Sequence, residues 1–100
     1  MTRTLTVSRV RVRAGQEGEY LAAVRELSAL HAGRGRRLWL FRRAGRSNEF
    51  LECSESPDET THRAVAVPPE DERRIEARIR AVADYDYGAW DLWEEVRSEA

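Results

Sequence analysis

Two histidines are the side chains of this sequence best suited to acid–base chemistry near neutral pH. His31 falls at the C-terminal end of the apolar stripe of a predicted helix, where it can pack and interact with the helix dipole, or act as a base at the rim of a cleft. His62 lies in an irregular segment before Pro68 and Pro69, either exposed or closing over a ligand. We take both as candidate catalytic residues. No close spacing joins them, so no metal site is predicted.

Aromatic side chains supply the candidate binding surface. Two acids and three aromatic residues share the segment 84–90, at a predicted helix-to-strand junction. A pocket for a planar aromatic ligand uses such residues, and packing between subunits explains them equally well. The residues predicted to bind substrate are Tyr20, Trp39, Phe41, Tyr85 and Trp90. Cys53 is the only cysteine, and we expect it to be a small core side chain rather than a nucleophile.

The elements that must position these residues follow the order strand, helix, hairpin, helix, strand. Apolar residues at helical spacing mark the helices, and short apolar runs between turn residues mark the strands. The predicted ranges are Leu5–Arg13 (strand), Gln16–His31 (helix), Leu38–Arg43 and Glu49–Glu55 (hairpin), Glu70–Ala83 (helix) and Trp90–Val96 (strand). The last range also fits a C-terminal helix, but residues 85–88 break the preceding helix and favour the strand. The interval 57–69 has no clear pattern.

This order is that of the ferredoxin-like βαββαβ fold, an α+β class, here as one domain of residues 1–100. Charge favours an antiparallel sheet in the order 4-1-3-2. Residues 1–48 carry eleven Arg and three acids, whereas residues 49–100 carry six Arg and fifteen acids. The order 4-1-3-2 places basic strands beside acidic ones, with Arg9 and Glu52 as an expected cross-strand pair.

Both helices cover one face of such a sheet, and in a chain of this length only a second copy can cover the other. Residues 38–41 are apolar on both faces of their predicted strand. We therefore expect a homodimer whose sheets pack face to face, with higher oligomers built from dimers left open.

Composition argues against several classes of partner. A net charge of −1 gives no overall attraction to nucleic acid, and acidic strands are expected to neutralise the arginines of residues 34–46. The N-terminus has no apolar signal core and no apolar run approaches the roughly 18 residues of a membrane span, so we expect no membrane partner and a cytoplasmic location. All seventeen basic residues are Arg, which is typical of a GC-rich bacterial genome.

Three segments carry a resemblance to a known superfamily: VSRVRVRAGQEGEYLAAVREL (7–27), RLWLFRRAGRSNEFLECSE (37–55) and DLWEEV (91–96). The chain resembles the dimeric α+β barrel superfamily, and within it the antibiotic-biosynthesis-monooxygenase-like and stress-response barrel proteins. The resemblance implies a dimeric α/β barrel, and its members include cofactor-independent oxygenases of polycyclic phenols. The haem-degrading branch has an Asn on its first strand, where this chain has Thr6 and Ser8, so haem degradation is not expected.

Two functions from different classes remain open. The first is a monooxygenase-like enzyme without a cofactor, acting on a planar aromatic or quinone-type molecule with His31 or His62 as base. The second is a non-catalytic protein of the same fold that binds a small ligand or supports assembly. A loss of rate in His31→Ala or His62→Ala with unchanged melting would favour the enzyme.

Overall fold

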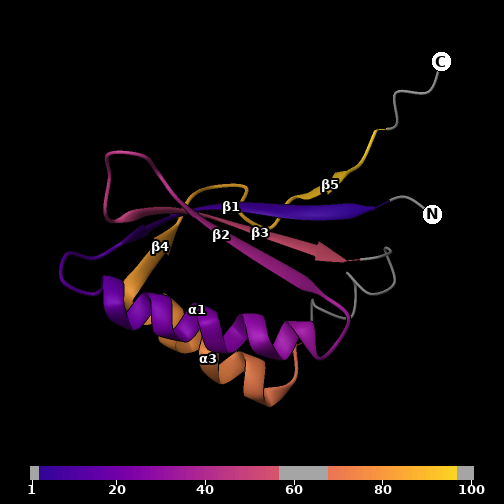
Figure 1. The fold of residues 1–100 in the computed structure, drawn as a ribbon, viewed down its shortest axis with the longest axis horizontal. Helices are drawn as coiled ribbons and strands as arrows, with labels where there is room; N and C mark the ends of the chain where they lie inside the picture. Colours follow the sequence, from indigo (N-terminus) through magenta and orange to yellow (C-terminus); the bar gives the residue numbers. More distant parts are fainter. Residues whose placement is uncertain (1–2, 57–67, 97–100) are drawn as a thin grey trace.

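Sheet and helices form two layers, with both helices on the same face of the sheet (Figure 1). The computed structural model describes residues 3–56 and 68–96. Its elements are β1 (Thr4–Val12), α1 (Glu17–Ala32), β2 (Arg37–Arg42), β3 (Glu49–Ser56), α3 (Glu70–Val82), β4 (Ala83–Tyr85) and β5 (Leu92–Glu94). Over these residues the antiparallel strands follow the order β2-β3-β1-β4, and β5 also pairs with β1. This confirms the predicted α+β ferredoxin-like sheet.

Two short strands fill the fourth position of the sheet, instead of the single strand predicted over Trp90–Val96. β4 follows α3 without a linker, because Ala83 already has extended backbone angles, and it pairs with residues 10–12 of β1. β5 pairs with residues 4–6 of the same strand. The predicted helix end at Ala83 is therefore one residue too long, and the alternative of a C-terminal helix is not formed at β5.

The turn between β4 and β5 carries Trp90, which the sequence had placed in a strand. Gly88 allows this turn because its φ of +80° is a left-handed conformation that other residues rarely adopt. The hydroxyl of Ser8 on β1 donates a 2.6 Å hydrogen bond to the carbonyl oxygen of Ala89. This buried contact fixes the turn, and with it Trp90, against the sheet.

The hydrophobic core lies between the sheet and the two helices. The stripe predicted on α1, from Tyr20 to His31, is the buried face of that helix. The apolar core residues are Val10, Val12, Tyr20, Ala23, Val24, Leu27, Phe50, Ile75, Ile79, Val82 and Ala83. Burial of one side chain the size of Ile79 stabilises the fold by roughly 1.5–3 kcal/mol, so this cluster holds both helices firmly on the sheet.

Cross-strand charge pairing is present, but in a different register from the expected one. Arg11 lies opposite Glu49 on β3, with Arg11 Nη2 3.7 Å from Glu49 Oε1. Arg9 lies opposite Leu51, so the expected pairing of Arg9 with Glu52 is wrong. Successive side chains of a strand point to opposite faces, and Glu52 points to the helices while Arg9 points away from them.

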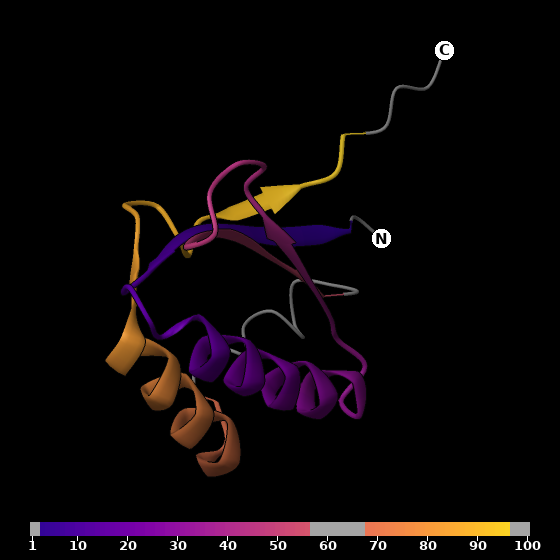
Figure 2. The same cartoon turned by 60° about the vertical axis from the view of Figure 1, so that its left-hand side comes forward.

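The second face of the sheet lies away from both helices (Figure 2). Phe41 and Trp93 on this face expose 55% and 59% of their surface. By strand parity and register, its apolar residues are Leu5, Val7, Trp39, Phe41, Leu51, Cys53 and Trp93. The prediction that residues 38–41 are apolar on both faces is confirmed. In the described part of the chain, neither helix is long and apolar enough to cross a membrane.

Candidate functional site

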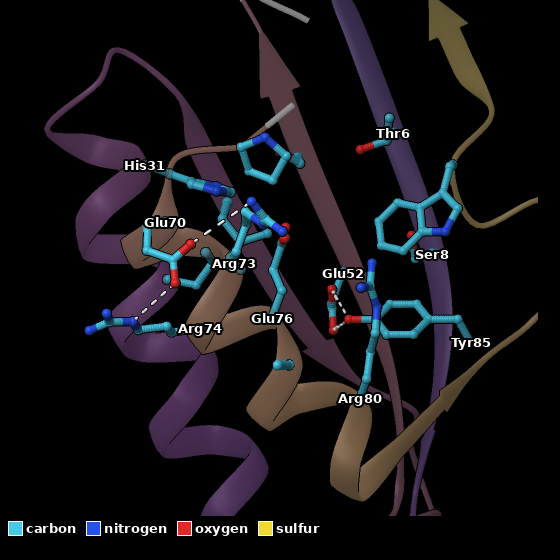
Figure 3. A pocket seen from close by; sticks show the side chains of 16 residues that line it. Thr6, Ser8, His31, Glu52, Glu70, Arg73, Arg74, Glu76, Arg80 and Tyr85 are labelled. Atoms are coloured by element: carbon cyan, nitrogen blue, oxygen red, sulfur yellow. Dashed lines mark hydrogen bonds and ion pairs between the residues drawn. The ribbon is translucent and has the colours of Figure 1, made fainter. Parts of the chain in front are cut away.

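A cavity of about 820 Å³ lies between the sheet and α3, beside the C-terminal end of α1 (Figure 3). Side chains of even number on β1 and β3 face the helices, because a strand alternates its side chains. Four of them form the floor of the cavity: Thr6, Ser8, Glu52 and Ser54. The sheet, the two helices and the turn between β4 and β5 thus each form a different side of the cavity.

Glu52 is the buried carboxyl of this cavity, with 8% of its surface exposed. Its Oε2 accepts a 2.5 Å hydrogen bond from the Tyr20 hydroxyl, and its two oxygens lie 2.9 and 2.8 Å from the donating Tyr85 hydroxyl. Burial raises the pKa of Glu52, and the two tyrosine hydrogen bonds offset only part of that rise. A carboxylate with a raised pKa is a stronger base than an exposed one, so Glu52 is suited to taking and returning a proton.

The two tyrosines act as hydrogen-bond donors to Glu52. Burial raises the pKa of both phenols, and the negative charge of Glu52 raises it further, so both stay protonated. Tyr20 is fully buried in the core, with its ring centroid 4.8 Å from that of Phe50. Tyr85 faces the cavity and contacts Trp90, with ring centroids 5.1 Å apart. Tyr85 and Trp90 form the aromatic wall of the cavity.

His31 lines the same cavity from the end of α1, but Glu72 holds its ring. His31 Nε2 lies 3.2 Å from Glu72 Oε1, and Nδ1 is buried without a hydrogen-bond partner in residues 3–56 and 68–96. Burial lowers the pKa of His31, and the positive charge of Arg36 lowers it further. We assign the neutral ring with its proton on Nε2, because Glu72 is an acceptor.

Glu72 is almost completely buried, with 1% of its surface exposed, and two arginines compensate its charge. Arg36 Nη2 donates to Oε1 at 2.6 Å, and Arg34 Nη1 donates to Oε2. Burial alone would raise the pKa of Glu72, but the hydrogen bonds from Arg34 and Arg36 outweigh it and lower the pKa. This network joins the end of α1 to the start of α3, so it fixes one end of the cavity.

The cavity brings together His31, Tyr85 and Trp90 among the residues predicted from the sequence. Tyr20 does not line it, and reaches it through its hydrogen bond to Glu52. Glu52 was missed as a site residue, because a Glu in a strand rich in acids is usually solvated. Its parity was the available signal, because Glu52 lies two residues after Phe50 and so shares the strand face that meets the core.

Trp39 and Phe41 lie on the opposite face of the sheet from this cavity. With Trp93 they line a separate hollow of about 500 Å³, so the structure does not bring them together with the other predicted binding residues. His62 lies outside the described residues. No cluster of His, Cys, Asp and Glu suited to a metal ion is found among the residues that are described.

No protein-family profile matches the sequence, and no curated protein is significantly similar to it. Solved structures, by contrast, match over nearly the whole chain. SnoaB, a cofactor-independent oxygenase from Streptomyces nogalater, has a TM-score of 0.78 at 17% identity, covering 100% of this chain and 97% of SnoaB. A candidate antibiotic biosynthesis monooxygenase from Caulobacter crescentus has a TM-score of 0.78 at 10% identity, covering 96% and 92%.

A conserved protein of unknown function from Bacteroides thetaiotaomicron, a possible oxidoreductase, has a TM-score of 0.75 at 17% identity, covering 94% of this chain and 96% of its own. At such identities the likeness concerns the fold, and the reaction has to be argued from the site. The structural neighbours agree with the resemblance of the three sequence segments. The chain therefore has the α+β fold of the antibiotic biosynthesis monooxygenase-like proteins.

Proposed function

We propose that this protein is a cofactor-independent oxygenase that acts on a planar phenolic or quinone-type molecule. The observation that carries the proposal is the Glu52 carboxyl, which is buried at the cavity floor and accepts hydrogen bonds from two tyrosine hydroxyls. The aromatic wall of Tyr85 and Trp90 favours a flat substrate. The likeness of the fold to SnoaB supports the reaction class.

The reaction requires a substrate carbon acidified by neighbouring hydroxylated rings, as in an anthrone. Glu52 takes one proton from this CH₂ group and leaves a carbanion delocalised into the rings. The carbanion passes one electron to O₂, the two radicals combine, and the proton from Glu52 completes a hydroperoxide. Glu52 then takes the second C–H proton while the O–O bond breaks, and hydroxide recovers that proton as water. The balance is CH₂ + O₂ → C=O + H₂O.

Oxygen uptake with 1,8-dihydroxyanthrone tests this role of Glu52. Glu52→Gln keeps the shape of the side chain but removes the base, and we expect the enzymatic rate above background to fall by about 10²-fold or more. Glu76→Gln is the matched control, because Glu76 also lines the cavity and burial also raises its pKa, but no tyrosine holds it. Equal rates for Glu52→Gln and the unmodified protein would contradict the proposal.

His31 is the second candidate base, and its geometry suits a positioning role better. Its Nε2 is engaged by Glu72 and its Nδ1 is buried, so a substrate proton reaches neither nitrogen directly. We propose that His31 shapes the cavity end, and that His31→Gln lowers the oxygen-uptake rate less than Glu52→Gln. The opposite ranking would make His31 the base.

A small-ligand carrier of the same fold is the alternative function. One observation favours it: Tyr20, Tyr85 and His31 are all already engaged by carboxylates inside the protein. A carrier binds planar aromatics without consuming oxygen. Tight binding of 1,8-dihydroxyanthrone with no oxygen uptake above background would select this alternative.

We also propose a homodimer through the sheet face that carries Phe41, because this face holds exposed aromatic side chains. Arg9 and Arg11 lie toward one end of the face, and Glu55 and Glu95 toward the other. In such a dimer the two-fold axis lies between the two sheets and runs perpendicular to the strands. It places the basic end of one copy over the acidic end of its partner. Phe41→Glu is expected to give monomers in analytical ultracentrifugation, and an unchanged mass would contradict this interface.

A further inference from the structure

The wall that α3 presents to the cavity is basic. Arg73, Ala77 and Arg80 follow one another at i, i+4 and i+7, so they share a face of the helix, and Arg74 adjoins Arg73. The side chains of Arg73, Arg74 and Arg80 all line the cavity (Figure 3). Glu70 forms ion pairs with both Arg73 and Arg74. Its Oε2 lies 3.9 Å from Arg73 Nη1, and its Oε1 lies 3.3 Å from Arg74 Nε. One carboxylate thus compensates two guanidinium groups.

Arg80 has no hydrogen bond or ion pair within residues 3–56 and 68–96. Glu76 lies one helical turn before Arg80 and lines the same cavity. The positive charge of Arg80 opposes the rise that burial causes in the pKa of Glu76, but no ion pair within 4.0 Å joins the two side chains. Arg80 and Tyr85 line the same cavity, and the positive charge of Arg80 opposes part of the rise that burial causes in the pKa of the Tyr85 phenol. A guanidinium group without a hydrogen bond or ion pair among the described residues therefore lies in the same cavity as a flat aromatic surface.

The floor opposite this wall offers hydrogen bonds but little negative charge. Thr6, Ser8 and Ser54 are neutral, and Glu52 is the one carboxyl among the described floor residues. Burial disfavours the ionised form of Glu52, which limits its competition for the Arg80 guanidinium. An anionic group of a ligand would thus be drawn to the α3 wall while its rings rest on the aromatic wall.

We propose that the ligand of this cavity is a planar aromatic molecule that carries a carboxylate, with the rings against Tyr85 and Trp90 and the carboxylate on Arg80. The inference rests on the function proposed above and adds the charge of its substrate. The planar guanidinium offers parallel N–H donors that match the two oxygens of a carboxylate. Arg73 and Arg74, which share Glu70, add positive potential at the same wall.

Calorimetric titration with two ligands of the same shape tests this inference. Anthraquinone-2-carboxylate and anthraquinone-2-carboxamide differ in charge, and we expect the carboxylate to bind about tenfold more tightly. Arg80→Gln should abolish this preference, and Arg80→Lys should retain part of it because it keeps the charge without the planar fork. Arg25→Gln makes the same change of net charge at an exposed position of α1 outside the cavity, and should leave the preference intact.

Equal affinities of the two ligands for the unmodified protein, or an unchanged preference in Arg80→Gln, would overturn the inference. Binding of neither ligand would overturn it as well. Oxygen uptake with the neutral 1,8-dihydroxyanthrone separates the two proposals. If uptake persists while the carboxylate preference is absent, the oxygenase stands and the charge inference fails. If the preference is present without uptake, the anionic ligand stands and the protein is a carrier.

Discussion

Replacement of Glu52 by Gln should remove activity and at the same time relieve a cost to stability that grows with pH. Burial raises the pKa of Glu52, so the folded state binds its proton more tightly than the unfolded chain does. The stability gained from that proton is fully present below the unfolded pKa, about 4.3, and is lost as the pH rises through the folded pKa. Gln carries no charge and shows no such loss.

The size of the effect follows from the hydrogen bonds and the burial. For each pKa unit by which the folded value of Glu52 exceeds the unfolded value, ionisation of Glu52 lowers the unfolding free energy by about 1.4 kcal/mol. Against this, Gln gives up the donation of two hydroxyls to a carboxylate, which stabilises by about 1.5–3 kcal/mol per bond when the acceptor is charged. The stability of Glu52→Gln relative to the unmodified protein thus depends on the balance between the lost hydrogen bonds and the removed charge. This difference in stability nevertheless changes with pH in one direction only, and it rises as the pH rises.

Urea unfolding followed by tryptophan fluorescence at pH 4, 5, 6 and 7 measures this dependence. The unfolding free energy of Glu52→Gln minus that of the unmodified protein should rise steadily with pH. Glu26→Gln is the control, because Glu26 is exposed and pairs with Arg78 at 2.8 Å, and its difference should stay flat or fall slightly. Parallel curves for Glu52→Gln and the unmodified protein would refute the claim that burial makes Glu52 an unusual acid.

Two further predictions concern the supports of the cavity. Glu72→Gln leaves Arg36 buried without its counter-charge and should lower the unfolding free energy by about 3–5 kcal/mol. Asp71→Asn breaks an exposed pair with Arg34 and should lower the unfolding free energy much less. Urea unfolding compares the two variants, and equal losses would contradict the buried network. Gly88→Ala forces a φ of +80° on a residue with a Cβ, which would also meet Asp91 Oδ2 at 3.0 Å, and should lower the melting temperature by several degrees; unchanged melting by circular dichroism would show that the turn relaxes.

The strand order could be predicted because it depends on features spread along the whole chain. The order of elements and the split of charge both favour β1 beside β3, and the pairing of Arg11 with Glu49 bears this out. The end of the chain was harder. Ala83 continues a helical pattern without a break, and a strand of three residues has no period from which to identify it. The sequence therefore predicts helix and turn where β4 forms.

The site was only partly predictable for a related reason. His31 and Tyr85 carry their own signals, a helical stripe and an aromatic cluster. Trp39 and Phe41 lie on a strand that is apolar on both faces, and only the pairing with β3 decides which face meets the helices. Glu52 needed the same information, because its burial follows from the tyrosines that α1 and β4 bring to it from distant parts of the sequence.

Mass spectrometry of the product formed under ¹⁸O₂ tests the central claim most directly. The unmodified protein should convert 1,8-dihydroxyanthrone to the quinone with one ¹⁸O atom in the new carbonyl, at a rate well above the buffer background. Glu52→Gln should yield labelled quinone only at the background rate. A labelled product formed equally fast by both proteins, or no acceleration by the unmodified protein, would contradict the account of Glu52 as the base of an oxygenase.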